Sequence, residues 1–442
     1  MLGILGLILG IIFMIWGAYK RFAALPLVII AGLIVIVSNG MEVWGTFSQT
    51  FMTGYTGFFI NFFLIFAASS LFAKVMEKTG SALSIGYKFL DWFGPKKAVV
   101  VVFLTTAALT YGGISLFVVV FAIAPIIMTL FNEANIPRRL AMAPLLAGAA
   151  TFTMKSLPGS PQLTNVAPTN FLGTSLDAAP LIGISSAVLM IVMQLAYFKW
   201  EEKRLKAAGE DFTFIPGSDI SAYQVNRVEL PSALKAFTPM VLVVAMIIGG
   251  TQMNRLGMSS FPTGALVITS MLVATVVAAA FNWDKLPQDK LQLINEGTGG
   301  AISAIAAPAA IVGFGAIVQA SPAFRQIVDG LLAMDMHPYI MAAVGPSAIA
   351  AITASSSGGL IITMEVLAEH FIQSGANLDH IHRLSAIFSG TFDALPHSTA
   401  LFLMFGYLGI SVKEGYRFVF WTAVLIPTIA GIIALGGAML LG

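Results

Sequence analysis

The stretch SGTFDALPHSTALFLMF, residues 389–405, constrains the fold of this chain more than any other. It carries an aspartate, a proline, a histidine and several hydroxyls, yet apolar runs flank it on both sides. Within a lipid bilayer, backbone that leaves a regular helix is tolerated only where protein or water satisfies the freed N–H and C=O groups. If the rest of the chain lies in a membrane, this stretch therefore predicts an unwound crossing that lines a polar cavity.

The composition places the chain in a membrane. Of its 442 residues, 57% are hydrophobic and only 10% are charged, whereas roughly a quarter of the residues of a soluble domain are charged. Apolar runs of about 20 residues, long enough to cross a bilayer as helices, recur along the whole length. The sequence therefore predicts an all-α polytopic membrane protein that is surrounded by the lipid bilayer.

The same composition excludes several classes of function. A net charge of +2 and the absence of a basic tract argue against a nucleic-acid partner. The chain has no cysteine, which excludes disulfides and thiol nucleophiles, and it has no HExxH, GxSxG or phosphate-binding loop motif. We therefore expect no enzyme activity, no bound metal and no organic cofactor.

The apolar runs are of two kinds. Continuous runs, predicted to span the membrane, cover residues 2–18, 24–39, 56–76, 177–199, 237–251, 263–281, 298–320 and 417–441. Broken runs, interrupted by polar or glycine-rich residues, cover residues 98–131, 139–173, 338–371 and 384–409. The first run is predicted to be a retained helix with its N-terminus outside, because its positive charges follow it instead of preceding it.

Short motifs recur in the same order in the two halves of the chain. They pair Gly112–Gly113 with Gly358–Gly359, Arg139–Leu140 with Arg383–Leu384, Leu157–Pro158 with Leu395–Pro396, and Leu172–Gly173 with Leu408–Gly409. Internal repeats of this kind are typical of secondary transporters. We therefore predict two repeats, residues 1–199 and 236–442, which a polar cytoplasmic linker at 200–235 joins.

Positive charges indicate how the repeats lie in the membrane, because lysine and arginine collect in cytoplasmic loops. The charges after the first run, at 74–97 and in the linker all fall inside if 98–131 is a re-entrant hairpin and 139–173 is a broken crossing helix. Each repeat then has about five spanning helices plus one re-entrant hairpin, 98–131 or 338–371. Because five is odd, the second repeat enters the membrane upside down, and the two form an inverted repeat.

The broken segments are the predicted binding site, because they would converge near the middle of the membrane. Half-helix N-termini there present partial positive charge and free N–H groups to an anion. The candidate substrate-binding residues are Thr110, Gly112, Gly113, Ser115, Lys155, Ser156, Gly159, Ser160, Thr164, Asn165, Ser355, Ser356, Ser357, Gly358, Gly359, His397, Ser398 and Thr399. The alternative for the glycines and serines is close helix packing, which small residues favour in lipid.

Ionisable residues in apolar segments are a sharper signal, since each costs about 2.5 kcal/mol or more at the bilayer centre. Lys155 is a candidate partner for a substrate carboxylate; alternatively, it extends to the membrane interface or pairs with a carboxylate of the protein. Asp393, His397 and Glu365 are candidate sites for the coupling ion, and histidine titrates near physiological pH. The alternatives are a helix cap for Asp393, a hydrogen-bonded core residue for His397 and an interhelical ion pair for Glu365.

A second pair of histidines, His380 and His382, is predicted to lie in an extramembrane loop. Their i, i+2 spacing is that of a strand, and no acidic or cysteine residue stands at ligand spacing, so a metal site is not expected. The amphipathic stretches 77–97 and 321–337 are predicted to lie along the two membrane interfaces.

Three longer segments resemble one known family: GTFDALPHSTALFLMFGYLGISVKEGYRFVF (390–420), LFAKVMEKTGSA (71–82) and LPGSPQLTNVAPTNFLGTSLDAAPLIGI (157–184). They are similar to the gluconate permease family of the GntP type, within the wider ion transporter superfamily, and the LPHS run is the most specific part. The resemblance implies a multi-pass symporter of the bacterial inner membrane. It implies a homodimer with scaffold and mobile transport domains that work as an elevator. It also implies a small organic anion, gluconate or another hydroxy acid or short carboxylate, carried with protons.

One segment departs from the family pattern. Gluconate carriers of this family have a PP-PGP motif, whereas this chain has Ser160 inserted between Gly159 and Pro161, with Lys155 shortly before. The departure leaves room for a less hydroxylated acid such as 3-hydroxybutyrate, or for a dicarboxylate or tricarboxylate. A sodium-coupled carrier of such acids would hold Na⁺ with Asn165, Ser160 and the serine-rich run at 355–357. A cation/proton antiporter, which needs carboxylates as its principal site, is a further alternative.

Overall fold

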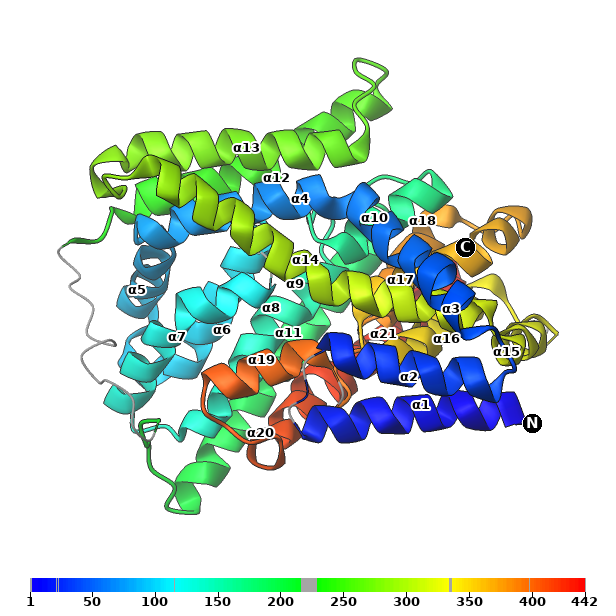
Figure 1. Ribbon diagram of the computed structural model, residues 1–442. Helices are drawn as coiled ribbons and strands as arrows, with labels where there is room; N and C mark the ends of the chain where they lie inside the picture. The colour runs from blue at the N-terminus through cyan, green and yellow to red at the C-terminus, as the bar shows by residue number, and fades with distance from the viewer. Residues whose placement is uncertain are drawn as a thin grey trace.

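The computed structural model describes residues 2–20, 22, 24–114, 116–215, 229–333, 336–396 and 398–441, which form helices and turns without a strand among them (Figure 1). The first half contains α1 (Leu2–Tyr19), α2 (Ala24–Ser38), α3 (Val43–Gly45), η1 (Thr46–Phe51), α4 (Met52–Lys78), α5 (Ser81–Phe93), η2 (Pro95–Lys97), α6 (Ala98–Tyr111), α7 (Leu116–Glu133), η3 (Arg138–Ala141), α8 (Met142–Ala150), α9 (Phe152–Lys155), α10 (Leu163–Leu172) and α11 (Pro180–Ala207). The second half contains α12 (Ala233–Arg255), α13 (Thr263–Phe281), η6 (Trp283–Lys285), α14 (Lys290–Ala320), α15 (Pro322–Leu332), α16 (Pro338–Thr353), α17 (Ser356–Gln373), α18 (Leu378–Phe388), α19 (Thr399–Tyr407), α20 (Val412–Val419), η7 (Phe420–Leu425) and α21 (Ile426–Leu441).

Several of these helices have the length and composition of membrane spans. In the described part of the chain, five continuous helical stretches are long and apolar enough to cross a bilayer: Val43–Lys78, Pro180–Ala207, Ala233–Asn254, Gly264–Phe281 and Val412–Leu441. Shorter apolar stretches of 10–17 residues occur in α1, α2, α6, α14 and α16. A prediction of an all-helical chain with several helices of membrane length is therefore confirmed.

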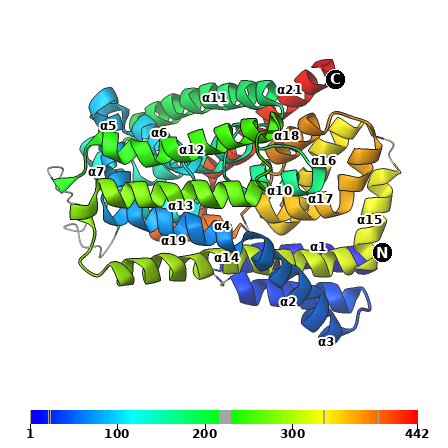
Figure 2. The same ribbon diagram turned by 90° about the horizontal axis from the view of Figure 1, so that it is seen from above.

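The same packing pairs recur in the two halves (Figures 1 and 2). Helix α1 packs against α2 as α12 packs against α13, and α6 packs against α7 and α8 as α16 packs against α17 and α18. Helices α4 and α14 run along each other through the middle of the molecule. The partners are exchanged between the halves, because α4 packs against α13 while α14 packs against α2.

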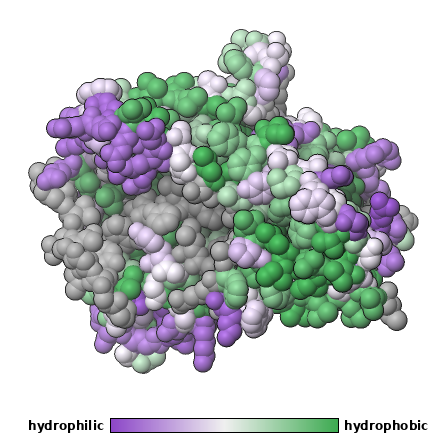
Figure 3. Space-filling model, viewed as in Figure 1, coloured by the Kyte–Doolittle hydropathy of each residue, from purple (hydrophilic) through white to green (hydrophobic). Residues whose placement is uncertain are grey.

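The outer surface of the helices is rich in exposed apolar side chains. Hydrophobic residues gather over α1 and α2, in the lower right of the space-filling view (Figure 3). Leu5 and Leu9 of α1 and Val37 of α2 are more than half exposed there. Contiguous apolar surface of this kind is rare on a soluble monomer and suits contact with lipid tails.

Two helical hairpins turn tightly, α6–α7 at residues 112–114 and α16–α17 at residues 354–355. Gly113 has a φ of +100° and Ala354 a φ of +49°, so each turn contains a left-handed residue. The sequence pairs Gly358 and Gly359 with Gly112 and Gly113 of the first hairpin turn, but the two residues do not lie in the second turn. They lie in the first turn of α17, because the Ser355 hydroxyl accepts a hydrogen bond from the Gly358 N–H at 3.1 Å and starts the helix one residue after the turn.

Gly359 instead allows α17 to approach α16 closely. A Cβ atom at this position would lie 2.7 Å from the Ala350 Cα atom, which is closer than side chains pack. The packing alternative considered for the small residues therefore holds at this glycine.

Two further segments leave the helical conformation within otherwise apolar surroundings. Helix α9 is a single turn that ends at Lys155, and residues 156–162 are unwound before α10 begins. Residues 389–396 and Ser398 are likewise not helical, between α18 and α19. Helix α10 starts inside the stretch predicted to be broken, so the first unwound segment is shorter than expected. We call 156–162 the first unwound segment, and 389–396 together with Ser398 the second.

The prediction that His380 and His382 lie in an extramembrane loop is wrong. Both belong to α18, whose N-cap Asn377 accepts hydrogen bonds from the N–H groups of Asp379 and His380. His382 has no exposed surface. The apolar residues of α18 recur at the helical period. The loop prediction relied on the strand-like spacing of the two histidines and did not take these apolar residues into account.

Candidate functional site

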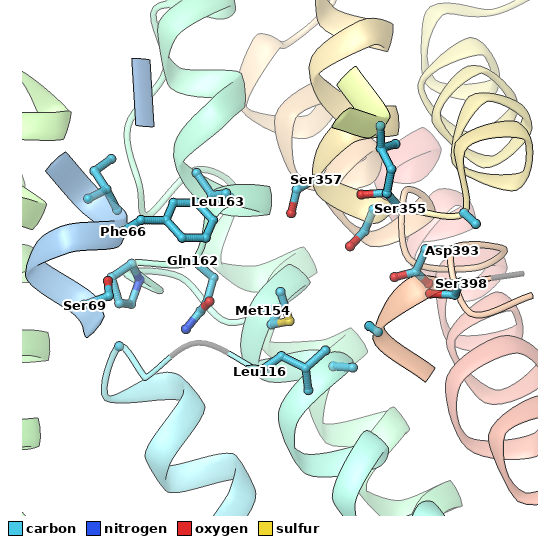
Figure 4. Close-up of a pocket in the computed structure, with 18 of the residues that line it drawn as sticks. Phe66, Ser69, Leu116, Met154, Gln162, Leu163, Ser355, Ser357, Asp393 and Ser398 are labelled. Carbon is cyan, nitrogen blue, oxygen red and sulfur yellow. The ribbon is translucent and has the colours of Figure 1, made fainter. Parts of the chain in front are cut away.

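A cavity of about 120 Å³ lies where both unwound segments and both hairpin turns meet the central helix α4 (Figure 4). Met154, Gln162 and Leu163 come from the first unwound segment and its flanks, and Asp393 and Ser398 come from the second. The full lining is Ile65, Phe66, Ser69, Ser70, Gly113, Leu116, Ala150, Met154, Pro161, Gln162, Leu163, Ile311, Ala354, Ser355, Ser356, Ser357, Asp393, Ser398 and Ala400. The cavity is thus apolar in most of its lining, with a few polar groups that converge from different elements, as ligand sites usually are.

The α6–α7 turn and the first unwound segment form one wall. The side-chain amide of Gln162 donates to the Thr110 carbonyl at 2.7 Å and to the Ile114 carbonyl at 3.3 Å. The Tyr111 hydroxyl donates to the Pro158 carbonyl at 2.8 Å. These bonds satisfy backbone groups that the turn leaves free, so the wall is held in place by its own side chains.

The start of α17 forms the facing wall, where Ser355 and Ser357 face Gln162 across the cavity (Figure 4). Helix α17 runs for 18 residues from Ser356. The partial positive charge of a helix N-terminus, together with its free N–H groups, favours an anion. This wall therefore combines a helix N-terminus with three serine hydroxyls at the edge of the cavity.

An ion pair lies at the second unwound segment. The Lys155 ammonium is 2.9 Å from the Asp393 Oδ2 atom, and the two side chains are 3% and 15% exposed. Asp393 lines the cavity, whereas Lys155 lies behind it. The other carboxylate oxygen of Asp393, Oδ1, is buried and has no hydrogen-bond partner among the described residues. Of the two partners considered for Lys155, the structure shows the protein carboxylate.

Gly390 makes this ion pair possible. A Cβ atom at Gly390 would lie 2.1 Å from the Cδ atom and 2.2 Å from the ammonium nitrogen of Lys155. The lysine side chain therefore crosses directly over the glycine to reach Asp393. Asp393 does not cap a helix, because its carboxylate accepts its hydrogen bond from the Lys155 ammonium.

The structure brings part of the predicted site to the cavity. Six predicted residues line it: Gly113, Ser355, Ser356, Ser357, Asp393 and Ser398. Ten others do not: Thr110, Gly112, Lys155, Ser156, Gly159, Ser160, Thr164, Asn165, Gly358 and Gly359. Thr399 begins α19, while Ser115 and His397 fall outside the described residues. Glu365 lies on the exposed side of α17 and accepts a hydrogen bond from the Gln319 side chain at 3.1 Å.

Ser160 of the first unwound segment and Asn165 of α10 bond to backbone groups instead of facing the cavity. The Ser160 hydroxyl donates to the Thr153 carbonyl at 2.7 Å. The Asn165 amide donates to the Ser160 carbonyl at 2.9 Å and to the Leu176 carbonyl at 2.8 Å. These side chains replace the helical hydrogen bonds that the unwound backbone has lost.

Sequence reasoning missed Ser69, Ser70 and Gln162 as lining residues. The Ser70 hydroxyl donates to the Gly297 carbonyl at 2.7 Å, which ties α4 to α14 beside the cavity. The adjacent serines in an otherwise apolar helix were a usable signal, because polar residues within spans tend to face the interior of a bundle. Gln162 had no such signal, since it lies in a segment that already contains other polar residues and prolines.

Comparison with known proteins identifies a family, related transporters and a solved structure with the same fold. The chain matches the family described as GntP family permease over residues 1–442. It is 32% identical over 455 residues to the uncharacterized transporter YxjC of Bacillus subtilis, across 96% of each chain, and 22% identical over 361 residues to an uncharacterized transporter of Haemophilus influenzae, across 80% of this chain and 78% of that one. The crystal structure of the YdaH transporter of Alcanivorax borkumensis matches with a TM-score of 0.52 at 13% identity, over 97% of this chain and 98% of that one, which shows a shared fold.

Proposed function

Because this chain belongs to the GntP family of permeases, we propose that it carries a small organic anion across the membrane together with protons. The family match confirms the resemblance drawn from the LPHS run and the two other segments. The protein is a multi-pass membrane transporter and not an enzyme. The proposal concerns the class of substrate and the identity of the coupling ion.

The lining and the size of the cavity support an anionic substrate. Its volume of about 120 Å³ is several times the minimum of about 10–15 Å³ that a cavity needs to hold one water molecule. That room suits a gluconate-like or 3-hydroxybutyrate-like hydroxy acid, or another short carboxylate. The carboxylate would lie toward the N-terminus of α17 and the hydroxyls of Ser355 and Ser357, and the apolar part of the acid would lie against Phe66 and Leu163.

The single observation that carries the proton coupling is the ion pair of Lys155 and Asp393 at the edge of this cavity. While Asp393 is ionised, it neutralises Lys155 and presents negative charge to an arriving anion. When Asp393 takes up a proton, the ammonium of Lys155 loses its partner and attracts the substrate carboxylate instead. A proton and an anion are therefore loaded together, because each makes the binding of the other more favourable.

The packing of the helices supports the proposed architecture of two inverted repeats. The recurring pairs, and the exchange in which α4 packs against α13 while α14 packs against α2, are the pattern that two repeats related by a two-fold axis would produce. The cavity lies between α4 and the unwound segments. We propose that α4 and α14 belong to a scaffold, that the hairpins and unwound segments form a mobile transport domain, and that the protein works as a homodimer in the bacterial inner membrane.

The sodium-coupled alternative has less support. It assigned Na⁺ to Asn165, Ser160 and the serine-rich run at 355–357. The serines line the cavity, but the Ser160 hydroxyl and carbonyl are both engaged in hydrogen bonds. The side-chain oxygen of Asn165 faces the Nε2 atom of His382 at 3.3 Å. A sodium ion would have to displace these contacts, whereas a proton on Asp393 leaves them in place.

The test is uptake of labelled gluconate, 3-hydroxybutyrate and citrate by proteoliposomes, under an imposed pH gradient and separately under a sodium gradient. The proposal expects one or more acids to accumulate under the pH gradient alone, and an uncoupler to abolish that accumulation. Accumulation only under the sodium gradient would favour the sodium-coupled alternative. If none of the acids accumulates and cations exchange for protons instead, the chain would be an antiporter.

A further inference from the structure

Arg383 of α18 is the largest side chain that the structure buries completely. Its Nε and Nη2 atoms donate to the Ala178 carbonyl at 3.1 and 3.0 Å, Nη2 also to the Leu176 carbonyl at 3.4 Å, and Nη1 to the Lys155 carbonyl at 3.3 Å. All four hydrogen bonds go to backbone oxygens. In the described part of the chain, no carboxylate forms an ion pair with this guanidinium.

These carbonyl groups lie outside the regular hydrogen bonds of a helix, and the Leu176 carbonyl also accepts from the Gly159 N–H at 2.9 Å and from the Asn165 amide at 2.8 Å. Lys155 is the last residue of the short helix α9, and a helix C-terminus presents unpaired carbonyls and partial negative charge. Leu176 and Ala178 belong to the irregular turn between α10 and α11. In transporters, unwound carbonyls and half-helix C-termini of this kind are the groups that hold a coupling cation.

The space is built around the guanidinium. Gly183 of α11 closes it, and a Cβ atom there would lie 2.2 Å from the Ser156 carbonyl oxygen and 3.3 Å from the Cδ and Nε atoms of Arg383. The neighbouring residue of α18, His382, adds a second link, since its Nδ1 atom lies 2.7 Å from the Thr174 hydroxyl. Helix α18 is thereby fastened to the turn after α10 by two adjacent side chains.

The matching arginine of the first half has different surroundings. Arg139, which the sequence pairs with Arg383, is about one-third exposed, forms an ion pair with Glu210 and lies over the ring of Phe418. Its charge is therefore balanced by a side-chain carboxylate near the surface. Only Arg383 of the two donates to carbonyl groups alone in a closed space, with the carboxylates of Asp177 and Asp379 near it but not in an ion pair with it, so Arg139 serves as a matched control.

We infer that Arg383 is a tethered cation, which permanently occupies a carbonyl cage that would otherwise need a dissolved monovalent cation. The cage holds the carbonyl of Lys155, so the guanidinium also positions the lysine whose ammonium meets Asp393. The inference deepens the proposed function and rests on it in one respect, since a filled cage leaves proton binding at Asp393 as the coupling event. Transport by the natural protein then needs no sodium at this position.

The test replaces Arg383 by alanine and supplies a free cation in solution. In R383A, the cage is vacated, so we expect the thermal stability of the purified protein to fall and to recover when millimolar guanidinium or methylguanidinium is added. Urea, which has the same planar shape without the charge, should not restore it, and the natural protein should respond to neither. R139A should not respond to guanidinium, because its partners lie near the surface.

The same variants are then compared in proteoliposomes, with the acid that the natural protein accumulates. Uptake by R383A should fall at least tenfold and return severalfold with guanidinium or with Na⁺, at an unchanged number of inserted molecules. If guanidinium and Na⁺ change neither the stability nor the uptake of R383A, or if urea acts as well as guanidinium, the tethered-cation inference is refuted. The stability measurement needs no substrate, so it gives its answer even if the proposed anion transport fails.

R383A can also be synthesised cell-free into nanodiscs in the presence or absence of guanidinium, in case it does not assemble in cells. Recovery of folded protein with guanidinium but not with urea supports the inference. Equal recovery in both, or recovery in neither, contradicts it.

Discussion

Replacing Asp393 by asparagine tests the proposed coupling directly. Asparagine has nearly the size of a protonated aspartate but no charge, so D393N holds the site permanently in the state that the proposal assigns to proton loading. The Lys155 ammonium, only 3% exposed in the ion pair, then lacks its counter-charge. We expect D393N to bind and exchange the anion but to lose the ability to accumulate it under a pH gradient.

The geometry indicates how large the effect should be. Two unit charges 2.9 Å apart attract each other by about 6 kcal/mol at an effective dielectric constant of about 20. Desolvation of both groups offsets part of this attraction, and removing one partner of a buried pair typically costs about 3–5 kcal/mol. If an arriving carboxylate recovers that free energy, protonation of Asp393 should strengthen anion binding by roughly a hundredfold to a few thousandfold.

The free energies of unfolding of three variants separate the contribution of the ion pair from that of its surroundings. D393N should lose about 3–5 kcal/mol, because Lys155 is stranded in a buried position. K155M should lose less, because the remaining carboxylate of Asp393 is 15% exposed and can take up a proton. The double variant K155M/D393N should recover much of the loss, since it leaves no buried charge.

The assay compares two kinds of flux in the same proteoliposomes. In counterflow, unlabelled acid inside exchanges for labelled acid outside, which needs substrate binding and movement of the carrier but no net proton transfer. Accumulation under a pH gradient needs substrate binding, movement of the carrier and net proton transfer. D393N should retain the first and lose the second. Accumulation by D393N at the level of the natural protein, or a double variant no more stable than D393N, would refute the reasoning.

Three further substitutions probe single features of the structure. G390A places a methyl group against the Lys155 side chain, so it should displace the ammonium and lower pH-driven uptake at least tenfold while leaving the amount of inserted protein unchanged. G148A brings a Cβ atom within 2.4 Å of a backbone oxygen of α6 and should cost about 1–3 kcal/mol in thermal unfolding, whereas G249A, which meets nothing within 4 Å, should leave stability unchanged. E365Q should leave pH-driven uptake within about twofold of the natural protein, a difference of about 0.4 kcal/mol, because Glu365 is exposed and does not line the cavity; a large loss would restore Glu365 as a coupling residue.

Much of the architecture could be predicted from local sequence. Apolar length and scarcity of charge predicted helices of membrane span, because both are properties of a single segment and its cost in lipid. The stretch at 389–405 was recognised as unsuited to a regular helix, and its first part is indeed unwound. The boundaries of the α16–α17 turn were missed, since the capping by Ser355 moves the turn to Ala354, ahead of the two glycines.

The candidate site could be predicted only in part. Asp393 and the serines at 355–357 stood out because polar groups are costly in an apolar segment. Gln162 and Ser69 line the same cavity, but their proximity depends on packing between elements far apart in the chain. The burial of Arg383 was not evident either, because its partners are carbonyl groups, which every residue carries and no sequence pattern reveals.

The ion pair of Lys155 and Asp393 illustrates the difference between what the sequence determined and what only the tertiary structure decided. The sequence by itself determined that each charge lies in an apolar segment and must therefore find a partner, since the cost of an unpaired charge in lipid depends on the local surroundings. Only the tertiary structure decided that the two are each other's partners across 238 positions of the chain, with a glycine to let the lysine pass. That choice depends on how the two unwound segments pack together, and such long-range packing is not encoded in either segment alone.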